Sequence, residues 1–274
     1  MKRVLCIIVL ACITMLGIPT RTLGQKLSID LPDVTESSAP VGEQPFGVLL
    51  NEIEIDPPST TSDSCQYVEL RGAPGSTIPA NTYFIDIDSG AGNFGVLNQV
   101  VNIGGRGFGP NGTIVLINVN NGFCPGRNLF TPGSRVIGYQ NPTSLSNGSE
   151  AYLLVQSTTT LNPGQDVDTN NDFNLDPALG ITAHDGFALL ANPGSEPVYG
   201  DEFGVVNISN TSPDQPDAVT RCPGNQTSFA ASAFYYGELA AAPDSTTTYV
   251  APFSANFPPG GMLTPSAQNV GTCG

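Results

Sequence analysis

The stretch GVLLNEIEID, residues 47–56, alternates apolar and acidic side chains and ends at a Pro-Pro pair. A period of two places successive side chains on opposite faces, which is the pattern of a strand with one buried face. Proline cannot donate to a strand ladder, so this strand is expected to end before residue 57. The apolar face is expected to carry Leu49, Ile53 and Ile55, and the acidic face Glu52, Glu54 and Asp56.

Further apolar runs of strand length follow along the chain, separated by turns rich in Gly and Pro. They begin at residues 67, 83, 96, 113, 151, 187, 203, 233 and 248. No stretch shows the apolar periodicity of a helix with one buried face. Short strands punctuated by turns predict an all-β protein, built as a sandwich or a barrel.

Several of these stretches resemble the lamin-tail domain, in the version found on secreted bacterial proteins. The resemblance is carried by LLNEIEIDPPS at 49, YVELRGAPGSTIPANTYFI at 67, GTIVLIN at 112, DGFALLANPG at 185, DAVTRCPG at 217 and LTPSAQNVG at 263. The match spans most of residues 47–271, with a long insertion around 119–184. The chain departs from the family in having no Trp, and in having Ser266 where Gly is usual.

The resemblance implies an immunoglobulin-like β-sandwich over residues 46–274. It also implies a binding or surface-attachment module with no catalytic residues.

The first 24 residues have the layout of a secretory signal peptide. Lys2 and Arg3 form a basic start, an apolar run follows to about Ile18, and small residues precede Gln25. The run has about fifteen residues, whereas a membrane-spanning helix needs ~20, and no later segment approaches that length. Cleavage after residue 24 predicts a secreted or cell-surface chain, in which the polar residues 25–45 form a flexible linker.

The chain is strongly acidic, with a formal net charge of −15. Residues 1–24 contain three of the nine basic residues and no acidic one, so six basic residues remain against twenty-four acidic residues. A field of that sign repels phosphate backbones, which argues against a nucleic-acid partner. Hydrophobic residues make up 39% and form strand-sized runs, which argues against a disordered acidic tail.

Four cysteines follow the signal peptide: Cys65, Cys124, Cys222 and Cys273. An even count in an exported chain predicts two disulfides, for which three connectivities are possible. No two of the four are near enough in sequence to form a CxxC metal-binding pair. We expect Cys65 to pair with Cys124, and Cys222 with Cys273, where the second bond would hold the C-terminus in place.

The stretch DVDTNNDFNLD, residues 166–176, concentrates oxygen ligands of the kind that calcium prefers. The candidate ligands are Asp166, Asp168, Asn170, Asp172 and Asp176. The first three match an EF-hand loop and Asn171 replaces its turn glycine, but Pro177 stands where that loop needs a bidentate Glu. The sequence therefore predicts either a shorter calcium loop, with an affinity of ~10⁻⁴–10⁻³ M, or a mobile, solvated acidic turn.

Three stretches imitate catalytic motifs. GFGPNG at 107–112 fits a dinucleotide-binding pattern but contains proline and precedes a strand, not a helix. DSG at 88–90 has no second copy that could complete an aspartic-protease dyad. The single histidine, His184, precedes Asp185, but no GxSxG elbow supplies a nucleophile, so a structural role is expected.

We therefore expect a secreted, non-enzymatic module for binding, adhesion or scaffolding, with an extracellular protein or glycan partner and calcium as a stabiliser. For glycans, Tyr235 and Tyr236 are candidate stacking residues, although strand spacing places one of them in the core. The alternative is a calcium-dependent hydrolase of extracellular polymers, with carboxylates such as Glu52, Glu54 and Glu69 as acid and base. That reaction requires two carboxyls ~5–10 Å apart in a concave pocket.

Overall fold

The computed structural model describes residues 46–58, 63–122, 124–127, 132–209 and 215–274, all of which belong to one compact unit. The expected signal peptide, 1–24, and linker, 25–45, lie outside the described residues. The strands in the described part are β1 (Val48–Glu54), β2 (Tyr67–Gly72), β3 (Thr82–Asp88), β4 (Leu97–Asn102), β5 (Thr113–Asn118), β6 (Arg135–Tyr139), β7 (Glu150–Gln156), β8 (Thr182–Leu189), β9 (Ala218–Arg221), β10 (Phe234–Leu239) and β11 (Tyr249–Pro252).

Helical structure in these residues consists of short 3-10 turns: η1 (Val119–Asn121), η2 (Pro177–Leu179), η3 (Asp201–Phe203) and η4 (Ala231–Ala233). None of them has the length or the apolar character that crossing a membrane requires.

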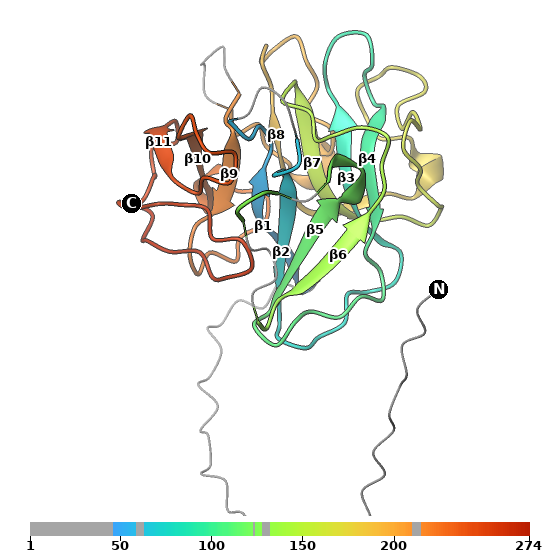
Figure 1. The fold of residues 1–274 in the computed structure, drawn as a ribbon. Helices are drawn as coiled ribbons and strands as arrows, with labels where there is room; N and C mark the ends of the chain where they lie inside the picture. The colour runs from blue at the N-terminus through green and yellow to red at the C-terminus, as the bar shows by residue number, and fades with distance from the viewer. Residues whose placement is uncertain (1–45, 59–62, 123, 128–131, 210–214) are drawn as a thin grey trace, which may run out of the picture. The chain divides into compact units, whose positions relative to one another are not determined.

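The strands form two sheets, which confirms the predicted all-β sandwich (Figure 1). The larger sheet has the order β11-β10-β9-β1-β2-β5-β6, and the smaller sheet has the order β4-β3-β7-β8. Neighbouring strands are antiparallel except β5 and β6, which are parallel. Both sheets contribute to the main core, with Leu50 and Val68 from the larger sheet and Phe84, Leu154 and Phe187 from the smaller.

A β-bulge in β1 changes which of its side chains share a face. The shift lies between Leu50 and Glu52, so Leu50, and not Leu49, joins Ile53 in the core between the sheets. The expected placement of Leu49 was therefore wrong. Glu52 and Glu54 lie on the other face as expected, but they are buried and do not face solvent.

The strand predictions failed at three places. The run at 203 is not a strand, since it starts at the end of η3 and pairs with β8 through a single bridge, Ala188 to Asn207. β6 was missed because its side chains are all exposed or half-buried, and β9 was not among the apolar runs, although it lies in the stretch DAVTRCPG that carries the family resemblance. The expected insertion at 119–184 contains β6 and β7, and β7, which matches the run expected at 151, is a central strand of the smaller sheet.

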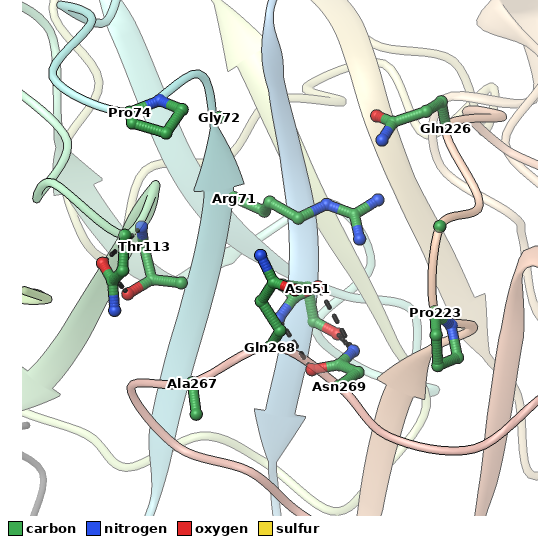
Figure 2. A pocket seen from close by; sticks show the side chains of 12 residues that line it. Asn51, Arg71, Gly72, Pro74, Thr113, Pro223, Gln226, Ala267, Gln268 and Asn269 are labelled. Carbon is green, nitrogen blue, oxygen red and sulfur yellow. Dashed lines mark hydrogen bonds between the residues drawn. The ribbon is translucent and has the colours of Figure 1, made fainter. Parts of the chain in front are cut away.

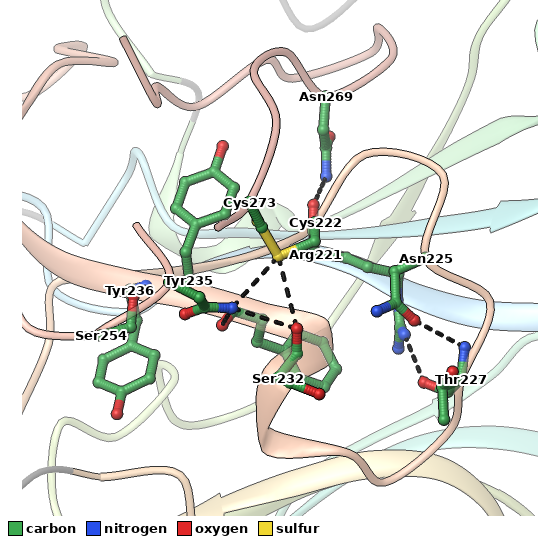
Figure 3. Close-up of a disulfide and its surroundings, with 12 residues drawn as sticks. Arg221, Cys222, Asn225, Thr227, Ser232, Tyr235, Tyr236, Ser254, Asn269 and Cys273 are labelled. Carbon is green, nitrogen blue, oxygen red and sulfur yellow. Dashed lines mark hydrogen bonds between the residues drawn. A yellow bond between two sulfur atoms is a disulfide. The ribbon is translucent and has the colours of Figure 1, made fainter. Parts of the chain in front are cut away.

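Both disulfides form with the expected connectivity, Cys65 to Cys124 and Cys222 to Cys273. Their sequence separations are 59 and 51 residues. Loops of this length are worth roughly 4 kcal/mol each in the chain-entropy account. The second bond attaches the C-terminal segment beside the end of β9 (Figure 3).

A fully buried ion pair joins the two sheets. Arg221 Nη2 on β9 lies 2.5 Å from Asp185 Oδ2 on β8, and the same oxygen accepts a hydrogen bond from Leu50 N at 2.7 Å. Burial raises the pKa of Asp185, and Arg221 opposes that rise. Asp185 thus pairs with an arginine and not with His184, whose ring stacks on Phe46 at 3.8 Å. The structural role expected for His184 agrees with this arrangement.

Candidate ligand-binding site

The outer face of the larger sheet is covered by the C-terminal segment 263–269, and two buried carboxylates hold that segment in place. Thr264 N donates to both carboxylate oxygens of Glu52, at 3.0 Å each. Ser266 N donates to Glu69 Oε2 at 2.5 Å. Glu52 is 1% exposed and Glu69 is 0% exposed. These two carboxylates therefore act as anchors for backbone amides.

Glu54, the third carboxylate of the hydrolase hypothesis, is also fully buried. It forms a bidentate ion pair with Arg127, in which Nη2 lies 3.0 Å from Oε1. Arg127 Nη2 also donates to the carbonyl oxygen of Thr246 at 2.6 Å, and the guanidinium lies 5.4 Å from the centre of the Tyr67 ring. The pair therefore connects β1 to loops on both sides of it.

Burial of the glutamates shifts their protonation. Desolvation raises the pKa of Glu52 to about 7, although hydrogen bonds from Tyr67, Thr264 and Thr220 act in the opposite direction. Desolvation also raises the pKa of Glu69 well above its ordinary value, and the neighbouring charge of Glu52 adds to that rise. Both groups therefore keep their protons to higher pH than an exposed glutamate does.

A polar pocket of about 260 Å³ opens on this outer face, above β1 and β2 (Figure 2). It is lined by five segments that are separate in the sequence. The lining residues are Asn51, Arg71, Gly72, Pro74, Asn111, Thr113, Pro223, Gly224, Gln226, Ala267, Gln268 and Asn269. The lining contains no carboxylate and no aromatic ring, so neither acid–base catalysis nor ring stacking is available there.

Arg71, at the end of β2, supplies the charge of this pocket. Its half-buried guanidinium crosses the pocket toward Gln226 (Figure 2). Nη2 donates to the carbonyl oxygen of Asn225 at 2.5 Å, whereas the buried Nε has no hydrogen-bond partner. Burial lowers the pKa of Arg71 to about 10, with a further contribution from the charge of Arg221, so the group stays cationic at neutral pH.

No acidic side chain in the described part of the chain forms an ion pair with Arg71. Glu69 and Asp185 are the carboxylates whose charges act on it. Both are engaged elsewhere, since Glu69 accepts from Asn51 at 2.6 Å and from Ser266, and Asp185 pairs with Arg221. The pocket therefore presents a cation that the surrounding protein has not neutralised.

Amide side chains make the pocket walls rigid. Asn51 Nδ2 donates to Asn269 Oδ1 at 2.9 Å, and Asn269 Nδ2 donates to the carbonyl oxygen of Arg221 at 2.7 Å (Figure 3). On the opposite wall, Asn111 Nδ2 donates to the carbonyl oxygen of Ser266 at 3.0 Å. Gln268 is exposed, and no hydrogen bond engages its side chain within the described residues. The pocket thus combines walls that are fixed by hydrogen bonds with one amide side chain, that of Gln268, that can reorient.

The expected calcium loop, 166–176, is folded around a buried Asp168. Asp168 Oδ1 accepts a hydrogen bond from Asp172 N at 3.0 Å. Asp168 Oδ2 accepts from Phe173 N at 3.0 Å and from the hydroxyl of Tyr199 at 2.9 Å. Asp168 therefore serves as the internal anchor of its own turn.

The other candidate ligands bond to neighbours within the loop. The contacts are Asp166 Oδ1 with Asp168 N at 2.9 Å, Asp176 Oδ2 with Thr169 Oγ1 at 2.8 Å, and Asp172 Oδ2 with Asn170 Nδ2 at 2.9 Å. Asn171 has a φ of +53°, the left-handed conformation expected where it replaces a glycine. In the described residues, His, Cys, Asp and Glu side chains form no metal-binding group of three, so a cation here would also need amide or carbonyl oxygens.

Sequence reasoning missed Arg71 and the amides around it. One signal was available: only five arginines and no lysine occur in residues 46–274, and Arg71 follows directly on the apolar-acidic alternation of YVEL at 67. Comparisons of the chain with protein-family models, with curated proteins and with solved structures found no match.

Proposed function

We propose that the chain is a non-enzymatic extracellular binding module whose ligand site is the pocket around Arg71. The observation that carries this proposal is the cation itself, because only one of its five N–H donors is engaged by the described residues. An unsatisfied, half-buried donor in a polar pocket is suited to an external acceptor. The resemblance to lamin-tail domains also supports a binding role, because it implies a binding or surface-attachment module.

The burial of the acidic residues argues against the hydrolase alternative. Glycoside hydrolysis needs two accessible carboxyl groups beside the substrate. Glu52, Glu54 and Glu69 are instead buried and occupied by backbone amides or by Arg127. We infer that they hold the walls of the pocket and take no part in chemistry.

We also propose that the chain is secreted or displayed on a cell surface. Two disulfides are typical of exported proteins, since reducing compartments keep thiols free. A rigid sandwich with a fixed polar pocket is suited to adhesion or scaffolding through an extracellular glycan or protein.

We also propose calcium as a stabiliser of loop 166–176, supported by the exposed oxygens of Asp166, Asn170 and Asp172. A ligand that binds only the folded state raises the melting temperature by mass action. We expect millimolar calcium to raise the melting temperature of the mature chain relative to EDTA, and Asp172→Asn to remove that rise. An identical melting temperature in calcium and EDTA would contradict calcium binding.

The binding function is tested with a variant that fills the pocket. Saturation-transfer NMR on the chain from residue 25 would use neutral sugars, sugar acids, amino acids and phosphate. We expect at least one of them to bind, Ala267→Trp to abolish that binding, and Ala178→Trp, which is exposed on η2, to preserve it. Binding that survives Ala267→Trp, or no binding by the whole panel, would contradict the proposed site. Release of new reducing ends from extracellular polysaccharides would contradict the non-enzymatic role.

A further inference from the structure

We propose that the Arg71 pocket recognises a sugar acid, a single hydroxyl-rich ring bearing one carboxylate, as in a uronic acid unit. This inference rests on the proposed binding function and adds the chemical class of the ligand. It follows from the charge, the lining and the size of the pocket.

The charge of the pocket favours an anion. Of the five arginines in the described part of the chain, Arg127 and Arg221 are in buried ion pairs, and Arg106 and Arg135 are exposed. Arg71 lies in the polar pocket, and no carboxylate in the described residues forms an ion pair with it. A half-buried charge is costly unless it is paired, so an acidic ligand would supply the missing partner.

The surroundings favour a carboxylate over a phosphate. The planar guanidinium matches a carboxylate with two parallel hydrogen bonds. Only one cation is present, and the charges of Glu69 and Asp185 already act on it. The chain also carries a net charge of −15, so a dianion would be repelled more strongly than a monoanion.

The lining favours hydroxyl groups on the rest of the ligand. Amide side chains offer donors and acceptors together, which suits the hydroxyls of a sugar. Gln268 is the adaptable amide of the pocket, Asn111 also lines it, and Thr113 lies on the side opposite Pro223 (Figure 2). The lining has no large aliphatic or aromatic side chain, so the carboxyl end of a peptide would find no apolar recess there.

The size of the pocket favours one ring. Pockets for drug-sized ligands span roughly 300–1,000 Å³. At about 260 Å³ this pocket is smaller and suits a single monosaccharide, free or within a chain.

The test is calorimetric titration of the mature chain with galacturonate, galactose, inorganic phosphate and acetylglycine. We expect galacturonate to bind, and galactose, which lacks the carboxylate, to bind at least about tenfold more weakly. Arg71→Gln should weaken galacturonate binding about ten- to a hundredfold, because it removes a charge-assisted pair. Arg135→Gln removes an exposed charge of the same kind and should leave the affinity unchanged.

Arg71→Lys provides a second variant in case Arg71→Gln disturbs the fold. It keeps the charge and loses the planar fork, so we expect intermediate affinity for galacturonate. A thermal melt of each variant checks that it is folded. If galacturonate is a ligand, a trisaccharide of galacturonate distinguishes a chain-binding site from a site for the free sugar.

Each contrary outcome identifies what is wrong. Equal binding of galactose and galacturonate, both lost in Ala267→Trp, would overturn the carboxylate inference and leave the pocket as a binding site. Tighter binding of phosphate or acetylglycine would overturn the sugar-acid assignment. No heat with galacturonate up to about 10 mM would overturn the inference, since weaker binding would show no specific recognition.

Discussion

The buried glutamate beneath the C-terminal segment makes the stability of the fold depend on pH. Glu52 has a folded-state pKa of about 7 because of its burial, against an ordinary value of 4.5. The folded state therefore binds more protons than the unfolded state between these two pH values. Stability linked to Glu52 is complete below pH 4.5 and is lost as the pH rises through 7.

The size of the effect follows from the two pKa values. A difference of one pKa unit corresponds to about 1.4 kcal/mol. Near pH 6 Glu52 is almost fully deprotonated in the unfolded state and mostly protonated in the folded state. The free energy of unfolding therefore falls by about 1 kcal/mol per pH unit. Between pH 5 and pH 8 the loss from Glu52 alone is about 2 to 3 kcal/mol.

The assay is urea unfolding of the wild-type chain and of Glu52→Gln at four pH values from 5 to 8. Glutamine resembles the protonated acid and does not titrate, so it should reduce the pH dependence by about 2 to 3 kcal/mol. Glu69, whose pKa is also raised, should act in the same direction in the wild type. Wild-type stability that rises with pH over this range, or an equal slope in both proteins, would refute the reasoning.

Three further predictions concern the anchors of the fold. Asp185→Ala leaves Arg221 buried without its partner, so we expect the free energy of unfolding in urea to fall by about 3–5 kcal/mol; a loss below about 1 kcal/mol would contradict the role of this ion pair. Replacing Cys222 and Cys273 together by Ser should cost roughly 4 kcal/mol and also weaken ligand binding, because this disulfide secures two pocket walls; unchanged calorimetric affinity would contradict that link. Asp168→Ala should lower the free energy of unfolding by about 1–3 kcal/mol even in EDTA, because the Asp168 carboxylate accepts hydrogen bonds from two backbone amides. An effect confined to calcium-containing buffer would show instead that Asp168 acts only through the metal.

The period-two pattern of residues 47–56 correctly predicted a strand in an all-β sandwich, because alternation directly reflects the two faces of a sheet. It failed at the bulge, where an added residue moved Leu50 into the core in place of Leu49. It also predicted that Glu52 faces solvent. The segment that covers Glu52 lies about two hundred residues later in the chain, and no local pattern shows that it returns there.

The candidate site was harder to predict than the fold. The spacing of the acidic residues in 166–176 indicated a candidate calcium loop, but spacing alone does not show that Asp168 points inward to Tyr199. Arg71 was overlooked because its pocket is assembled from five separate segments, and only the tertiary structure brings them together. The even count of cysteines predicted two disulfides but left three connectivities open, and the expected one is the one that the structure shows.

The central claim is that the ligand site of this module is the Arg71 pocket. The most direct measurement is a ¹H–¹⁵N spectrum of the arginine Nε–H groups during titration with galacturonate. Residues 46–274 contain only five arginines, and Arg71→Lys assigns the relevant signal. We predict that the Arg71 signal shifts to saturation with the affinity measured by calorimetry, while the Arg135 signal stays in place. An unmoved Arg71 signal, or equal shifts of all the arginines, would contradict the account.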